Sequence, residues 1–181
     1  WAKNMIQLVS QTDIKKNNSL MFWGSFLGLE RGHFIFWEKE WDNIAGEGYR
    51  QHVLPKVVSW LRERTERTGL AYNFMRDNAP TYTVGPTLAW LNANGVGLIS
   101  LPALSPDLNP IEDIWRMMKV HIQTRYPEFR REGQGSRPDV RRIVEEAWYD
   151  CTTTHKLMEL IKSMPIRCQD VLDADGGPIS Y

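Results

Sequence analysis

The chain has 181 residues, a length that suits one domain with its own hydrophobic core. Hydrophobic residues make up 42% and charged residues 24% of the sequence, a balance that is typical of globular proteins and excludes a disordered chain. Lys and Arg together number 22, as do Asp and Glu, so the formal net charge is zero. Neutrality argues against a stand-alone, strongly basic DNA-binding domain, but it does not exclude a metal-dependent nuclease.

The two cysteines, Cys151 and Cys168, have no metal-ligand spacing and no secretory context, which favours free thiols in a reducing compartment. No apolar run reaches the length of a membrane span and no signal peptide is present, so we expect an intracellular protein without membrane contact. The sequence starts at Trp1 rather than Met, which indicates a fragment or a processed piece.

The first part of the chain predicts an antiparallel meander. A short apolar run over residues 5–9 is followed by a polar stretch with a turn signal at residues 10–19. Aromatic-rich runs at residues 20–26 and 33–37 predict two buried strands. Residues 38–48 are charged and contain Gly, which favours a loop.

A helix and a crossover unit are predicted next. Apolar residues recur at helical spacing from Tyr49 to Leu61, with Pro55 expected to kink or restart the helix and Gly69 to end it. Strand, short helix and strand then follow, at residues 70–75, 86–92 and 96–101. This order and length predict two parallel strands joined by a helix.

The second half of the chain predicts helices and a basic loop. Asn109 is a good N-cap with Pro110 at the first helical position, and the residues after them place one apolar face on the core: Ile111, Ile114, Trp115 and Met118. Residues 125–138 form an Arg-rich basic loop. Further helices are expected from residue 139 and over residues 154–164, followed by a C-terminal tail at residues 165–181 that is at most partly ordered.

Asp77 and Glu112 are the candidate metal ligands. Asp77 follows a predicted strand, Glu112 lies in the first turn of a predicted helix, and 34 residues separate them. A strand end and a helix start can bring two carboxylates together, and such a pair can hold a divalent metal. Each acid also has a structural explanation: Asp77 could set a turn, and Glu112 could form a capping box with Asn109.

Two stretches resemble the signature blocks of the mariner-superfamily DDE transposases: Arg-Asp-Asn-Ala-Pro at residues 76–80 and Ser-Pro-Asp-Leu-Asn-Pro-Ile-Glu-Asp-Ile-Trp at residues 105–115. Residues 21–24 and 163–177 resemble further parts of the same family. The resemblance covers most of the chain, so residues 1–181 are interpreted as a partial catalytic domain.

The resemblance implies a ribonuclease H-like α/β fold, a mixed five-stranded sheet with helices on both faces. It also implies metal-dependent DNA cleavage and strand transfer, with Mg²⁺ or Mn²⁺ held by Asp77 and Glu112 as catalytic residues. The implied partners are DNA, both transposon ends and target, and a second copy of the chain; the implied location is the nucleus.

Candidate DNA contacts lie around the two blocks and in the basic loop: Asn78, Asn109, Arg116, Lys119, Arg130 and Arg131. The arginines of the loop region could contact phosphates. The alternative is a solvated face, since Glu128, Glu132 and Asp139 are interleaved with them. If the loop binds phosphates, deleting it should remove the salt-dependent affinity for DNA.

The sequence departs from the family pattern in three ways. The family's first catalytic Asp lies on a first core strand, and Asp13 is too close to Leu20 to match it. We therefore expect a sheet that lacks this central strand and a site with two of three carboxylates. The family's N-terminal helix-turn-helix region is not matched, and Tyr82 stands where the family usually has His.

Three functions follow from these observations. The chain could be part of an active transposase, or a catalytically inactive remnant that at most binds nucleic acid or protein. An unrelated α/β domain is disfavoured by the length of the block at residues 105–115.

Overall fold

A computed structural model describes residues 5–6, 10–12, 20–41, 46–76, 85–102, 105–127, 137–177 and 179. Several residues that the sequence singled out lie outside these ranges: Asp13, Asp77, Asn78, Tyr82, Arg130 and Arg131.

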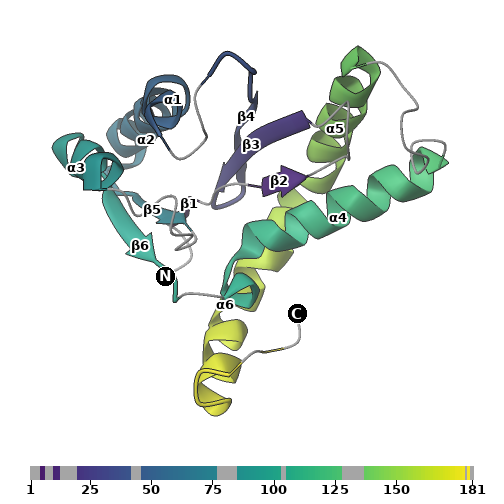
Figure 1. The fold of residues 1–181 in the computed structure, drawn as a ribbon. Coiled ribbons are helices and arrows are strands. Elements are labelled where there is room, and N and C mark those ends of the chain that lie inside the picture. Colours follow the sequence, from purple (N-terminus) through teal and green to yellow (C-terminus); the bar gives the residue numbers. More distant parts are fainter. Residues whose placement is uncertain are drawn as a thin grey trace.

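The described strands form one six-stranded mixed sheet (Figure 1): β1 (Met5–Ile6), β2 (Ser10–Thr12), β3 (Leu20–Leu27), β4 (Glu30–Phe36), β5 (Asn73–Arg76) and β6 (Gly97–Ser100). β3 and β4 form an antiparallel hairpin, with Phe22 opposite Phe36. β5 and β6 pair in parallel, with Asn73 opposite Gly97. The antiparallel meander and the parallel crossover predicted from the sequence are both confirmed.

A short strand occupies the centre of this sheet. β1 pairs antiparallel with β3, where Ile6 lies opposite Leu27, and in parallel with β5, where Ile6 lies opposite Phe74. The expectation of a sheet without its central strand is thereby corrected. The free N–H and C=O groups along two strand edges favour pairing with an apolar segment, and residues 5–6 supply one. Since no acidic residue precedes Asp13, β1 adds no carboxylate.

The sheet separates two hydrophobic clusters, because alternate residues of β3 face opposite sides. Trp23 and Leu27 belong to the cluster on the side of α1 (Glu47–His52), α2 (Leu54–Thr68) and α3 (Gly85–Ala93). Phe22 and Phe26 belong to the cluster on the side of α4 (Pro110–Arg125), α5 (Arg137–Cys151) and α6 (Thr154–Asp173). Figure 1 shows these two groups of helices on either side of β3 and β4.

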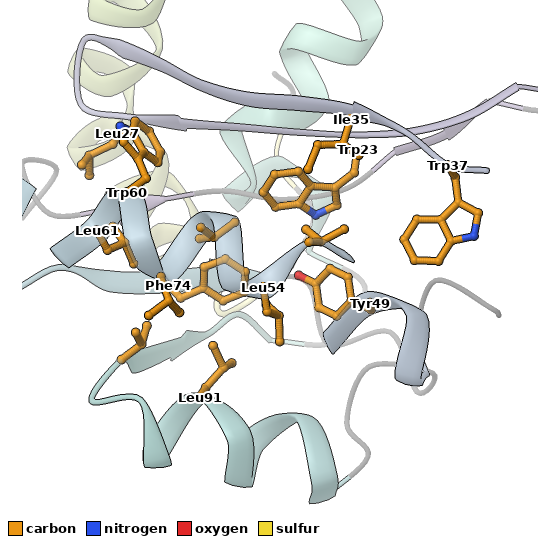
Figure 2. Close-up of a cluster of buried hydrophobic side chains, with 14 residues drawn as sticks. Trp23, Leu27, Ile35, Trp37, Tyr49, Leu54, Trp60, Leu61, Phe74 and Leu91 are labelled. Carbon is orange, nitrogen blue, oxygen red and sulfur yellow. The ribbon is translucent and has the colours of Figure 1, made fainter. Parts of the chain in front are cut away.

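Figure 2 shows the first cluster: side chains of α1 and α2 lie below β3 and β4, and Leu91 of α3 lies on the side of Phe74, farther from these two strands. The helical stretch breaks at Val53, and α2 restarts with Pro55 in its first turn. Gly69 ends α2 in the left-handed conformation, at φ 69°, which glycine adopts without the steric cost of a Cβ. Pro55 and Gly69 therefore act as predicted.

The last helix is longer than the sequence indicated. Thr153 caps its start by accepting a hydrogen bond from Lys156 N, and α6 then continues through Pro165 to Asp173. Residues 165–173, which were assigned to a partly ordered tail, are therefore helical. Tertiary packing offsets the cost of the missing proline N–H, since Met164 and Arg167 on either side of Pro165 are buried. Among the described residues, no helix has the length and apolar character needed to cross a membrane.

Candidate active site

The segments that carry Asp77 and Glu112 meet in one packed cluster. β5 ends at Arg76, so Asp77 directly follows the strand. Met75 is buried in a hydrophobic cluster with Leu108, which precedes Glu112 by four residues. The same cluster includes Leu101, which follows β6, and Met164 of α6. Because β5 and β6 are parallel, their carboxyl ends lie at one edge of the sheet, beside the start of α4.

Glu112 lies half-buried in the first turn of α4. The 3-10 helix η3 (Pro106–Leu108) leads into this turn, and Asp107 stabilises it by accepting a hydrogen bond from Leu108 N at 3.1 Å. Asp107 therefore sets the turn that precedes α4. The positive end of the α4 dipole favours the ionised form of a carboxylate at this position.

A capping box would have two hydrogen bonds at the start of α4, and the one from the Asn109 side chain is not formed. Asn109 is the N-cap residue by backbone conformation, but its side chain makes no capping hydrogen bond. Its N–H donates to Pro106 O at 3.0 Å. The Asn109 side chain is 1% exposed, and its Oδ1 has no hydrogen-bond partner among the described residues. A buried oxygen without a partner is costly, so Oδ1 is a further candidate ligand or contact next to Glu112.

Asp113 has a role that the sequence did not reveal. An acid in the first turn of a helix commonly adds to the charge at the helix start, but Asp113 is 7% exposed and pairs with Arg167 of α6, with Oδ2 to Nη2 at 2.6 Å. Its other oxygen, Oδ1, pairs with Arg116. No local signal could have identified Arg167, because 54 residues separate the partners of this ion pair.

The predicted DNA contacts are only partly described. Arg116 and Lys119 are exposed on α4, four and seven residues after Glu112, so the three share one helical face. Asn109 is buried. In the loop region, α4 extends to Arg125 and α5 begins at Arg137.

Three arginines of this region pair within the molecule: Arg125 and Arg142 with Glu146, and Arg141 with Glu38. For these three residues the structure favours an intramolecular role over a phosphate contact.

A second group of possible ligands lies at the far end of α4. Side-chain atoms of His121, Glu146 and Asp150 lie within 4.8 Å of one another. His121 is nine residues from Glu112, about 14 Å along the helix axis, so this group is separate from the predicted site. Arg125 lies against two of its members, with Nε 3.0 Å from Glu146 and Nη1 3.9 Å from Asp150. This guanidinium already neutralises the carboxylates, so the group is best explained as an ion-pair network.

The Glu146 pKa is lowered in this network, first by a hydrogen bond from the Tyr126 hydroxyl to Oε2 at 2.7 Å and then by the charges of Arg125 and Arg142. A carboxyl whose pKa is lower in the folded state stabilises the fold above its unfolded pKa, and this contribution is lost as the pH falls through the folded value. We expect Tyr126→Phe to lower the Tm at neutral pH and to have no effect once Glu146 is protonated in both proteins. Thermal unfolding at neutral and acidic pH measures this difference.

The matched control is Tyr149→Phe, since the Tyr149 ring lies under Arg31 and its hydroxyl has no hydrogen bond among those described. It should change stability equally little at both pH values. If the Tm of Tyr126→Phe is also below that of the wild type at acidic pH, the hydroxyl stabilises the fold by packing alone.

Comparison with known proteins finds relatives of this chain. A family model described as DDE superfamily endonuclease matches residues 47–132, which include Asp77 and Glu112. The Tc1 transposase of Caenorhabditis elegans is 31% identical over 90% of this chain, and the Tcb2 transposase of Caenorhabditis briggsae is 28% identical over 94%. The chain is a homologue of the Tc1/mariner transposases. It spans about half the length of these relatives, 55% of Tc1 and 58% of Tcb2.

Solved structures support the fold of this Tc1/mariner homologue. The catalytic domain of Mos1 mariner transposase superposes with a TM-score of 0.79 at 15% identity, covering 99% of this chain and 86% of that domain. A Mos1 paired-end complex with Mn superposes with a TM-score of 0.74, covering 99% of this chain and 58% of the Mos1 chain. The likeness confirms the ribonuclease H-like class predicted from the two sequence blocks.

Proposed function

We propose that this chain is the catalytic core of a DDE-type transposase, which cleaves DNA and transfers DNA strands with the help of a divalent metal. The observation that carries the proposal is the position of Glu112 in the first turn of α4, beside the cluster that also holds the end of β5. The similarity to transposases extends through both segments.

The residues present fit a hard divalent cation such as Mg²⁺ or Mn²⁺. Asp77 and Glu112 would each offer carboxylate oxygens, which these ions prefer. Asn109 adds a buried amide oxygen without a described partner in the same turn as Glu112. The proposed donor set is therefore made of oxygen.

When bound, such an ion supplies Lewis-acid stabilisation to the oxygens of a phosphodiester undergoing cleavage. The chain would hold it through Asp77 and Glu112, and the positive end of the α4 dipole favours a negative charge at the position of Glu112. Arg116 and Lys119 extend along the same face of α4 and would contact DNA phosphates. Asp113 holds the Arg116 guanidinium and so restricts its direction.

The partners we propose are DNA, both transposon ends and target, and a second copy of the chain, with the nucleus as the place of action. Phosphate contacts through Arg116 and Lys119 predict binding that weakens as salt rises. Arg130 and Arg131 of the basic loop and Asn78 remain proposed DNA contacts.

A second function is favoured by the sequence of β1. β1 lies beside β5, the strand that Asp77 follows, and its two residues, Met5 and Ile6, add no carboxylate. A site with two carboxylates in place of three suits a catalytically inactive remnant that retains nucleic-acid or protein binding.

Metal binding tests the proposed site. We expect the purified chain to bind Mn²⁺, measured by electron paramagnetic resonance, and both Asp77→Ala and Glu112→Gln to abolish this binding. Glu145→Gln, which removes an exposed acid of α5, is the matched control and should bind as the wild type does. Equal binding by all four proteins, or none by the wild type, would rule out the site.

Nicking of supercoiled DNA then separates the two functions. Mn²⁺-dependent nicking that is lost in Asp77→Ala supports the transposase core. Salt-dependent DNA binding without nicking supports the remnant.

A further inference from the structure

The second half of α6 packs beside the segments that carry the proposed metal ligands. On its apolar side, Met164, Cys168 and Val171 belong to the cluster that contains Met75 and Leu108. Met75 is two residues before Asp77, and Leu108 is four residues before Glu112. α6 therefore contacts η3 and α4 directly and shares one hydrophobic cluster with the end of β5.

On its polar side, α6 contributes Arg167, whose side chain is 4% exposed. The guanidinium donates to Asp113 Oδ2 at 2.6 Å and to the backbone oxygen of Asp107 at 3.0 Å, while Nε donates to Ser163 Oγ at 2.9 Å. Arg167 thus binds η3 and the first turn of α4 from one side chain. Figure 1 shows the start of α4 lying against α6.

Stability alone does not explain this ion pair. The cost of removing two charges from water can exceed their mutual attraction, and well-packed apolar residues often serve as well or better. A guanidinium makes the contact directional. Its N–H groups lie in one plane at fixed angles, so they form good hydrogen bonds only with acceptors in a narrow range of positions. Asp113 is the residue next to Glu112, so its fixed position also limits where the Glu112 backbone can lie.

We infer that Arg167 is a positioning residue for the metal site: it fixes η3 and the first turn of α4, and thereby the position of Glu112. Through Asp113, it also fixes the direction of Arg116. The inference rests on the proposed function, since the metal site that Arg167 would position is the site of that proposal.

Arg167→Lys tests this role, because lysine keeps the charge and most of the length but cannot form the paired, directed hydrogen bonds. We expect the Mn²⁺ affinity of the whole chain to fall about 10- to 100-fold, as for the loss of other groups that orient metal ligands. The control is Arg64→Lys. Arg64 is also mostly buried and pairs with Glu30 at 2.6 Å, but it lies on α2 on the other side of the sheet.

Hydrogen exchange of the metal-free chain provides a readout that does not depend on the proposed function. Arg167→Lys should accelerate amide exchange in residues 105–116 while exchange in β3 and β4 stays unchanged, and Arg64→Lys should leave residues 105–116 as in the wild type. Unchanged exchange there in Arg167→Lys would overturn the inference, as would unchanged Mn²⁺ affinity. If the wild type binds no Mn²⁺ but exchange accelerates as expected, the proposed function fails and Arg167 still positions α4.

Discussion

Replacing Trp148 with alanine is expected to lower the free energy of unfolding by about 4 kcal/mol, within the range for buried Trp-to-Ala changes. The side chain is fully buried on α5 and stacks on Phe34 of β4, with ring centroids 4.9 Å apart, and on Trp115 of α4, at 5.6 Å. Its loss leaves a cavity where three elements meet. For a chain of this size the Tm should fall by about 10 °C, measured by circular dichroism.

Two further variants test the packing around Trp148. Trp148→Phe keeps a ring and removes an indole N–H that has no hydrogen-bond partner among the described residues, so it should cost much less. A Cβ at Gly24 would lie 2.8 Å from Trp115 Cη2 and 2.9 Å from Trp148 Cη2. Gly24→Ala should therefore destabilise the wild type more than it destabilises Trp148→Ala. If the losses of unfolding free energy in Gly24→Ala and Trp148→Ala add strictly in the double variant, this contact is contradicted.

Asp113→Ala is expected to lower the free energy of unfolding by about 3 kcal/mol, because it leaves the buried Arg167 guanidinium without its carboxylate. The loss should lie at the lower end of the usual range, since Arg167 keeps the Asp107 carbonyl and the Ser163 hydroxyl as acceptors. Urea unfolding at constant temperature measures it.

The double variant Asp113→Leu/Arg167→Met removes both charges and fills the space with apolar atoms. It should be more stable than Asp113→Ala, since the main cost in the single variant is a buried charge without a partner. A double variant that unfolds at a lower urea concentration than Asp113→Ala would show that the ion pair itself stabilises the fold.

Local patterns predicted the parts of the fold in which neighbouring residues decide the conformation. The aromatic-rich run at residues 20–26, predicted to be a buried strand, forms most of β3 (Leu20–Leu27) and is largely buried. Gly69 ends α2 because a left-handed conformation is required there. The apolar face of α4, from Ile111 to Met118, is buried as its spacing indicated. Each of these follows from the composition of a short run, from a period of 3.6 residues, or from the chemistry of one residue.

Interactions between distant segments overturned the other expectations. Ser10–Thr12 is polar and was predicted to belong to a turn region, yet it pairs with the start of β3, with Ser10 opposite Phe22. β1 takes the central position beside β5. α6 continues through Pro165, although that proline favours a helix end. In each case another segment of the chain satisfies the backbone or buries the side chains: the next strand for Ser10–Thr12, and segments far along the sequence for β1 and α6.

For the candidate site, the sequence by itself determined the two acids, their places after a strand and in the first turn of a helix, and the family that carries such blocks. Only the tertiary structure decided what holds the turn of Glu112. Arg167, which the sequence assigned to a tail, reaches Asp113 across 54 residues, and Asn109 leaves Oδ1 without a capping bond. Side-chain direction and burial depend on which elements pack together, and a local pattern carries no information about a partner so far along the chain.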